Sequence, residues 1–229
     1  MFYRNSICVL FFLIFLSCSD DLYVEPALKI PTINIDVNNF EEINSKDDYV
    51  KGTFEFNSRD YDFEDFVQPI KIRGRGNSTW DMPKKSYQFK LEEKHNLFNF
   101  PEDKKWLMLA NYSDKTMLRN ALAFELGYLS KLDWTPNYHF AEVVINGKAK
   151  GLYQFTEKVE TGDDNRVKIG DEGFLLEVDQ LSRIDYDDIS FWTEKKLLFV
   201  VKDPDLESGS SELEKIKSYV IQTENVLYS

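Results

Sequence analysis

IKIRGRGNSTWDMPKKSYQFK, residues 70–90, combines two alternating segments with a glycine-rich turn. Residues 70–73 and 85–91 alternate along the chain with a period of two, which is typical of half-buried strands. Gly74 and Gly76 lie between them and allow backbone angles that other residues resist. The sequence therefore predicts a strand, a turn that the following polar residues help to close, and a second strand.

Basic side chains flank this turn on both sides. Arg73 and Arg75 precede it, and Lys84 and Lys85 follow it. A turn that combines backbone N–H groups with several cations suits an anion such as phosphate. A hairpin with solvated charges has the same pattern, so both interpretations stay open on chemistry alone.

The composition favours a globular protein with an acidic surface. Of the 229 residues, 42% are hydrophobic and 30% are charged, and the formal net charge is −12. Such a charge argues against a general nucleic-acid or anionic-membrane surface, and we expect no nucleic-acid partner. A local basic site in an acidic chain suits a small anion better than a polyanion.

The N-terminal residues resemble a lipoprotein signal. Arg4 precedes the apolar run Ile7–Leu16, which is too short to span a bilayer, so residues 1–17 are predicted to be a signal peptide. Leu-Ser-Cys at its end resembles a bacterial lipobox, so Cys18 is the expected lipidation site and residues 18–29 the tether. Acidic residues after the cysteine resemble an export signal for the outer face of the outer membrane. An uncleaved apolar N-terminus is the alternative.

Cysteine and histidine give no metal-site pattern. Cys8 would leave with the signal peptide and Cys18 would be modified, so we expect neither a disulfide nor a cysteine metal site. His95 and His139 have no partners at ligand spacing. The sequence therefore predicts no metal ligand.

Further elements are expected on both sides of the central hairpin. Strands are predicted over 30–37, 51–57, 138–146, 151–157, 174–179 and 197–201, and a final helix over 212–226. Another helix, over 114–130, has two adjacent apolar stripes and is expected to be buried over a wide arc. The stripes consist of Met117, Ala121, Phe124 and Tyr128, and of Leu118, Leu122, Leu126 and Leu129.

The central stretch also resembles a known family. RGRGNSTWDMPKKSYQFKL resembles the opening signature of the spore coat protein H (CotH) kinase family. Three later stretches match that family in the same order: KKWLMLANYSDKTMLRNALAFEL (104–126), AEVVINGKAKGLYQFTEKVE (141–160) and GFLLEVD (173–179). Four ordered blocks are more specific than a lone motif.

The resemblance implies a fold and an activity. The expected fold is α+β and atypical protein-kinase-like. It comprises mainly an N-terminal antiparallel-sheet lobe with one buried helix and an incomplete C-terminal lobe, over residues 30–229. The expected activity is ATP-dependent phosphorylation of serine on secreted or surface proteins, with ATP and Mg²⁺ as cofactors and a cell-surface protein as substrate.

The same resemblance gives the expected nucleotide-binding residues. They are Arg73, Arg75, Asn77, Ser78, Lys85, Arg119 and Glu157. Lys85 is the first choice for the phosphate cation and Lys90 the second, while Glu125 and Asp114 are both open as its acid partner. Glu157 would lie near the hinge segment that contacts the adenine base. A plain ion pair, or the cap of a strand end, is the alternative at these positions.

The family's catalytic and Mg²⁺-binding acidic residues follow a helix like 212–226, and residues 227–229 supply none of them. We therefore expect a truncated or binding-only relative, with no catalytic residue and no useful phosphoryl transfer. Glu177 and Asp179 share one strand face and leave open a Mg²⁺ pair, a glycosidase-like pair or a solvated face.

A surface lipoprotein that binds glycan or protein is the alternative function. Aromatic residues make up 15% of the chain, including Trp80, Trp106, Trp134 and Trp192.

Overall fold

The computed structural model describes residues 30–59, 61–162 and 166–229. The predicted signal peptide (1–17), tether (18–29) and lipidation site (Cys18) lie outside the described residues, so these predictions stay untested. Within the described ranges, no helix combines the length and the apolar character needed to cross a membrane.

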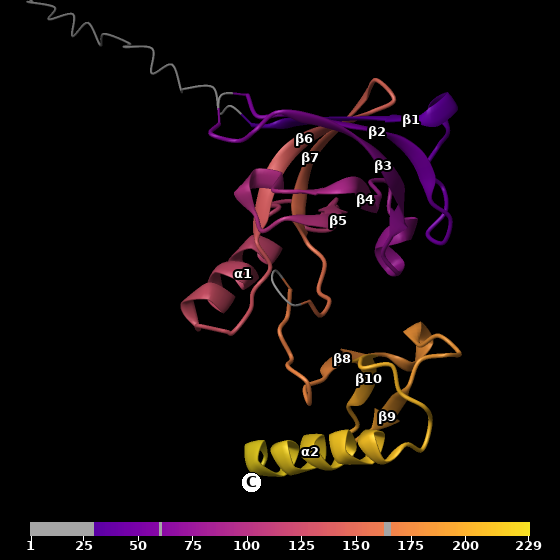
Figure 1. Cartoon of the computed structure of the whole chain (residues 1–229), viewed down its shortest axis with the longest axis vertical. Helices are drawn as coiled ribbons and strands as arrows, with labels where there is room; N and C mark the ends of the chain where they lie inside the picture. Colours follow the sequence, from indigo (N-terminus) through magenta and orange to yellow (C-terminus); the bar gives the residue numbers. More distant parts are fainter. Residues whose placement is uncertain (1–29, 60, 163–165) are drawn as a thin grey trace, which may run out of the picture.

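Seven strands form a closed barrel in the order β1-β2-β3-β4-β5-β7-β6 (Figure 1). Neighbouring strands are antiparallel, except that β1 and β6 run parallel and close the barrel. The strands are β1 Thr32–Val37, β2 Val50–Asn57, β3 Phe66–Arg75, β4 Ser86–His95, β5 Asp103–Leu109, β6 Tyr138–Ile145 and β7 Lys148–Glu157. The predicted strands and the central hairpin of β3 and β4 are thereby confirmed.

Alternating residues of each strand fill the barrel. Ile72 of β3, Phe89 of β4, Trp106 of β5 and Phe155 of β7 are 0% exposed, and their neighbours in sequence point outward. Burying one large apolar side chain stabilises a fold by about 1.5–3 kcal/mol. The period of two in the sequence therefore becomes the inward face of a closed sheet.

The expected kinase-like lobe with an antiparallel sheet is wrong. The sheet is mixed and closed, because Thr32–Ile35 of β1 pairs in parallel with Glu142–Ile145 of β6. Beside this pairing, the Asn146 amide N–H donates to the Ile35 carbonyl at 2.9 Å. Periodicity shows which face of a strand is buried, but it does not show which edge strands meet.

A small second unit replaces the expected incomplete C-terminal lobe. Its antiparallel sheet has the order β8-β10-β9, with β8 Leu175–Asp179, β9 Ser190–Trp192 and β10 Leu198–Asp203. Helix α2, Ser211–Leu227, packs on it through Leu213, Ile216 and Val220, and Figure 1 shows this unit below the barrel. The predicted final helix is confirmed.

The expectation of a buried helix before β6 is also wrong. Helix α1, Arg119–Leu129, buries Ala121 and Gly127. One stripe faces the barrel, where the Phe124 ring lies 5.6 Å from the Tyr138 ring. The residues of the other stripe are between 54% and 77% exposed: Leu118, Leu122, Leu126 and Leu129.

Candidate functional site

The glycine-rich turn is held against the rim of the barrel by a tryptophan. Trp80 lies in the short 3₁₀ helix η2, Ser78–Asp81, and packs against the barrel core. Its ring covers Gly74 so closely that a Cβ there would be 2.2 Å from a ring carbon. Gly76 turns the chain with a φ of +107°, a conformation that glycine adopts without strain. The two glycines therefore have different tasks, close packing and chain reversal.

Lys84 and Lys85 leave the turn in different directions. The Lys84 ammonium donates to the Leu152 carbonyl and lies 4.2 Å from the centroid of the Tyr153 ring. Desolvation lowers the pKa of Lys84, because neither neighbour compensates its charge. The Lys85 ammonium instead donates to the Trp80 carbonyl and lies 4.9 Å from that ring.

A cavity of about 250 Å³, which we call the polar pocket, lies between the η2 turn, the start of β4 and the start of α1. Its charged residues are Lys84, Arg119 and Asp114, and the others offer hydroxyls, amides or backbone groups. The lining consists of Thr79, Met82, Lys84, Ser86, Ala110, Asn111, Tyr112, Ser113, Asp114, Arg119 and Asn120. Cations from two separate parts of the chain thus share one cavity.

Asp114 stabilises the turn that leads into α1 by accepting hydrogen bonds from it. Its carboxylate accepts the Arg119 backbone N–H at 2.8 Å, the Thr116 hydroxyl at 2.7 Å and the Thr116 N–H at 3.2 Å. These hydrogen bonds, that from the Arg119 backbone first, hold the pKa of Asp114 below its usual value. The Arg119 side chain is 82% exposed, with Nε 3.8 Å from an Asp114 oxygen. Its guanidinium can therefore reach a ligand without breaking a buried contact.

A chain of amides joins the first turn of α1 to the barrel. Asn120 Nδ2 donates to Asn111 Oδ1 at 3.0 Å, and Asn111 Nδ2 donates to Gln154 Oε1 at 2.7 Å. Gln154 lies on β7 and is 0% exposed. On the other side of the polar pocket, Ser86 Oγ accepts the Ala110 N–H at 2.9 Å. Both walls of the pocket are thereby fixed to barrel strands.

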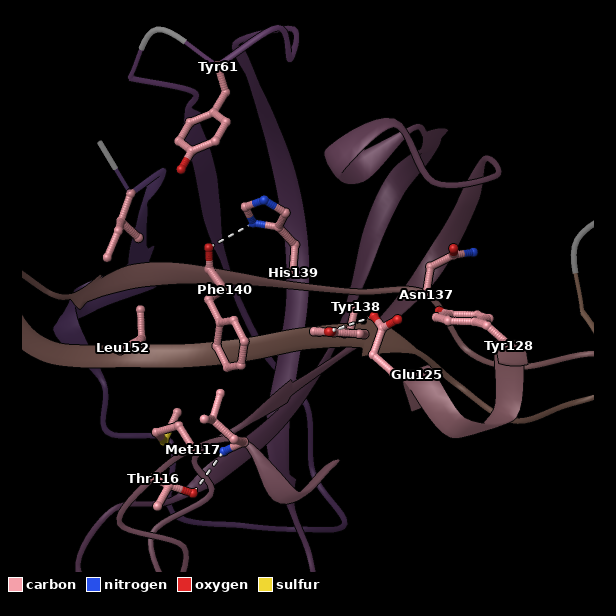
Figure 2. A pocket seen from close by; sticks show the side chains of 12 residues that line it. Tyr61, Thr116, Met117, Glu125, Tyr128, Asn137, Tyr138, His139, Phe140 and Leu152 are labelled. Carbon is pink, nitrogen blue, oxygen red and sulfur yellow. Dashed lines mark hydrogen bonds between the residues drawn. The ribbon is translucent and has the colours of Figure 1, made fainter. Parts of the chain in front are cut away.

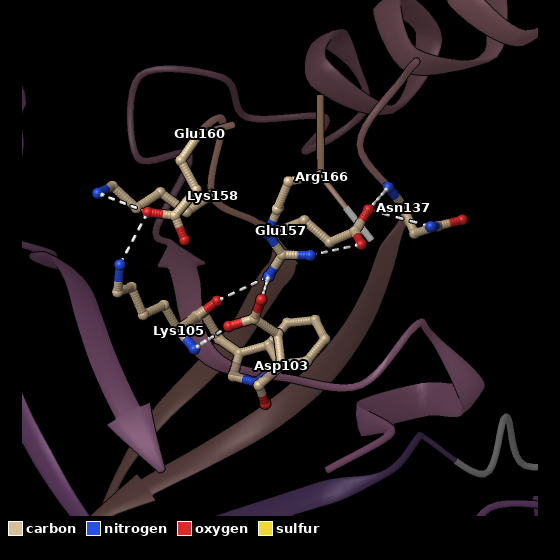
Figure 3. Close-up of polar contacts among 8 residues, drawn as sticks. Asp103, Lys105, Asn137, Glu157, Lys158, Glu160 and Arg166 are labelled. Atoms are coloured by element: carbon tan, nitrogen blue, oxygen red, sulfur yellow. Dashed lines mark hydrogen bonds and ion pairs between the residues drawn. The ribbon is translucent and has the colours of Figure 1, made fainter. Parts of the chain in front are cut away.

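Beyond the polar pocket, a buried ion network joins three segments of the chain (Figure 3). Arg166 lies between two acids, 2.9 Å from Glu157 and 3.2 Å from Asp103. The second Glu157 oxygen accepts the backbone N–H and the side-chain amide of Asn137, at 2.7 and 3.0 Å. Burial raises the pKa of Glu157, while Asn137 and the charge of Arg166 act in the opposite direction.

The family model described as CotH kinase protein matches residues 72–229, which is more than half of the chain. This chain belongs to the CotH kinase protein family. Membership suggests a kinase-related function. No protein with a curated description matches the chain.

The structure separates the residues that the CotH resemblance singled out. Arg119 lines the polar pocket, and Asn77 and Ser78 directly precede Thr79, which also lines it. Arg75 is the cross-strand partner of Ser86, which lines the same pocket. Burial lowers the pKa of Arg75, and its side chain forms no hydrogen bond or ion pair within the described ranges.

Three of the expected nucleotide-binding residues lie elsewhere. Arg73 lies 4.8 Å from the centroid of the Tyr49 ring, and Lys85 lines a cavity with Trp80 at the barrel mouth. Both carboxylate oxygens of Glu157 accept hydrogen bonds or ion pairs from the network described above. Nucleotide contacts by these three residues stay predictions.

Lys84, Asn111 and Asn120 were not among the expected site residues. The signal for Lys84 was present, because it belongs to the basic pair that follows the glycine-rich turn. In the structure Lys84 lines the polar pocket, whereas Lys85 lines the cavity at the barrel mouth together with Tyr87. No sequence signal joins Asn111 to Asn120, since their contact depends on the turn that precedes α1.

The polar pocket fits a phosphate group better than it fits a magnesium ion. Lys84 and Arg119, with nearby hydroxyl and amide donors, provide the groups that bind phosphate oxygens. The volume of about 250 Å³ is smaller than that of a pocket for a whole drug-sized ligand. In the described part of the chain, no group of three or more His, Cys, Asp or Glu could hold a metal ion. We derive no step through the ion.

Glu177 and Asp179, the other acidic pair considered from the sequence, form surface ion pairs. Lys202 lies 3.6 Å from Glu177, and Arg183 lies 3.4 Å from Asp179. These contacts favour the solvated strand face among the three interpretations.

Proposed function

We propose that the polar pocket binds a phosphate group of a nucleoside triphosphate such as ATP, as part of a CotH-like, kinase-related function. The observation that carries the proposal is that Lys84 and Arg119 meet in one cavity with hydroxyl and amide donors. Family membership supports the nucleotide as the source of that phosphate.

Lys84 is the residue that gains most from an anion. Its ammonium is partly dehydrated, and its neighbours are a carbonyl and an aromatic ring, which carry no formal negative charge. A phosphate oxygen would supply the missing counter-charge. A hydrogen bond to a charged group contributes about 1.5–3 kcal/mol.

Arg119 and Arg75 supply the remaining positive charge. Asp114 fixes the backbone of Arg119 and leaves its guanidinium exposed at the pocket. Arg75 extends from the same sheet face as Ser86. These side chains bind and orient the phosphate, and the amide chain through Asn111 keeps the two walls of the pocket at a fixed separation.

Titration calorimetry with ATP, with and without Mg²⁺, tests this proposal. Lys84→Gln is expected to weaken ATP binding by about tenfold or more, the equivalent of about 1.4 kcal/mol or more. Lys85→Gln tests the choice made from the sequence, and Lys94→Gln, an exposed lysine at the far end of β4, is the matched control. An effect of Lys85→Gln with none of Lys84→Gln would place the phosphate at the barrel mouth and contradict the proposal.

We further propose that the protein is an envelope lipoprotein, anchored through Cys18 on the outer face of the outer membrane, where it acts on a surface protein. The lipobox-like Leu-Ser-Cys and the acidic residues after it support this proposal. Metabolic labelling with an alkyne fatty acid is expected to mark the wild-type protein and not the Cys18→Ser variant. Protease treatment of intact cells tests surface exposure, and full protection would exclude it.

The glycan-binding alternative gains little support from the tryptophans. Trp106 is 0% exposed, Trp80 packs against the barrel core, and Trp192 is 55% exposed. One exposed tryptophan ring does not provide an extended aromatic surface for a glycan, so we do not propose this function. Binding of the protein to a glycan array, without any binding of ATP, would support it instead.

A further inference from the structure

A second cavity, which we call the aromatic pocket, lies on the outer face of β6 and β7 beside the start of α1 (Figure 2). Its volume is about 630 Å³, within the range of small-molecule sites. Its lining shares no residue with that of the polar pocket and consists of Ile30, Tyr61, Thr116, Met117, Leu118, Glu125, Tyr128, Asn137, Tyr138, His139, Phe140 and Leu152.

The walls of this pocket are aromatic and aliphatic because outward residues of two strands meet the segment before α1. Tyr138 and Phe140 alternate outward on β6, with their rings 6.0 Å apart and edge to face. Met117 faces them from the other side, as Figure 2 shows. Tyr61 and Tyr128 each present a partly exposed ring at the rim. The pocket therefore offers an apolar floor surrounded by tyrosine faces.

The charge of the pocket is negative. Among its lining residues, Glu125 is the one acid, and none is a lysine or arginine. Desolvation lowers the pKa of His139, which disfavours a positive charge on its ring. The Tyr138 hydroxyl donates to one Glu125 oxygen at 2.9 Å, and the other oxygen accepts no hydrogen bond within the described ranges. Figure 2 shows this hydrogen bond between the Tyr138 hydroxyl and the Glu125 carboxylate.

We propose that the aromatic pocket binds a small organic ammonium ion whose apolar body lies against Phe140 and Met117 and whose positive head meets Glu125. Tyrosine faces attract cations through the negative charge of the ring face, and a carboxylate at the same position adds a direct ion pair. A ligand that carries a carboxylate in place of the ammonium would be repelled by Glu125, because both groups are negatively charged. This inference is independent of the proposed phosphate site.

Three probes of similar shape test the charge preference: 2-phenylethylammonium, 2-phenylethanol and 3-phenylpropionate. In ¹H–¹⁵N NMR titrations of the whole chain, the ammonium is expected to bind about tenfold more tightly than the alcohol. The acid is expected to bind more weakly than the alcohol. Shifts should concentrate on β6, on residues 116–118 and on the second half of α1, which carries Glu125 and Tyr128. Equal affinity of the ammonium and the acid, or shifts confined to other surfaces, would overturn the proposal.

Variants separate the ion pair from the apolar contact. Glu125→Gln is expected to weaken ammonium binding about fivefold to tenfold and to leave alcohol binding unchanged. Glu142→Gln is the matched control, because Glu142 is exposed on β6, the strand of Tyr138 and Phe140, and does not line the pocket. Wild-type affinity of Glu125→Gln for the ammonium would exclude the ion pair.

A second variant tests the apolar wall without disturbing the fold. Leu118 lines the pocket and is 59% exposed, so Leu118→Ser should fold normally. It is expected to weaken the ammonium and the alcohol by similar factors, and unchanged binding of both would exclude the assigned wall. ATP titration of Glu125→Gln should match the wild type, so failure of one site is distinguishable from failure of the other.

Discussion

Lys84 and Lys85 are adjacent in the chain, yet they serve two different cavities. Lys84 lines the polar pocket, and Lys85 lines the cavity at the barrel mouth beside Trp80. Their ammonium groups have different partners, the Leu152 carbonyl for Lys84 and the Trp80 carbonyl for Lys85. The charge that the hairpin offers to an anion is therefore divided between two surfaces.

Gly74→Ala is expected to destabilise the protein by about 1–3 kcal/mol, because the new methyl group would overlap the Trp80 ring. Urea unfolding followed by circular dichroism measures the change. In a Trp80→Leu background the same substitution should have a much smaller effect, since the overlapping ring is absent. Equal effects in both backgrounds would show that Gly74 is required for another reason.

Arg166→Met is expected to lower the free energy of unfolding by about 3–5 kcal/mol, because it leaves the Glu157 carboxylate buried without its cation. Adding Glu157→Leu should restore part of the loss. The matched control is Arg183→Met, which removes a more exposed ion pair with Asp179 and should cost about 0–1 kcal/mol. Similar effects of the two arginine variants in urea unfolding would contradict a buried network.

Asp114 is expected to make stability depend on pH in the acidic range. Its pKa is lowered in the folded state, so its contribution is present above the ordinary aspartate pKa of about 3.9. That contribution is lost as the pH falls through the lower, folded-state pKa. The difference in unfolding free energy between wild type and Asp114→Asn should therefore be largest near neutral pH and shrink on acidification.

Asp133→Asn serves as the control for this pH series, because Asp133 is an exposed aspartate that follows α1. The free energy of unfolding of Asp133→Asn should differ little from that of the wild type at every pH. A difference for Asp114→Asn that grows as the pH falls would show that the carboxylate is not stabilised by its hydrogen bonds.

Leu122→Gln is expected to change the free energy of unfolding by less than about 0.5 kcal/mol, because Leu122 is 61% exposed. Its neighbour Ala121 is 6% exposed, and Ala121→Leu should destabilise the protein by about 1–3 kcal/mol through overpacking. Thermal and urea unfolding of the pair would distinguish the two faces of α1. A large loss for Leu122→Gln would mean that this face is covered after all.

Local structure was predictable to the extent that it depends on alternation. The period of two around Ile72 and Phe89 predicts both strands of the central hairpin and the face that each one buries. Closure was not predictable, because it depends on Ile35 meeting Ile145 across nearly half of the chain. The burial of α1 was overestimated because two apolar stripes in a sequence do not show how many partners the fold supplies.

The kind of ligand that suits the candidate site could be predicted from the sequence, but the residues that form the site were predicted less well. Arg119 and the basic turn could be named from the sequence, since charge and glycine content are local properties. The assignment of the phosphate cation to Lys85 depended on the family resemblance, with its head group expected at the edge of the core. In the structure Lys84 lines the polar pocket, and Lys85 lines the cavity at the barrel mouth.

The network around Arg166 also has a mechanical consequence. Arg166 belongs to the strap between the barrel and the second unit, and Asn137 ends the connection from α1 to β6. Glu157 binds both of them, so one buried carboxylate holds the segment that follows β7 beside the connection that precedes β6. Loss of this carboxylate should therefore loosen both connections together, although they are separated in the sequence by two whole strands.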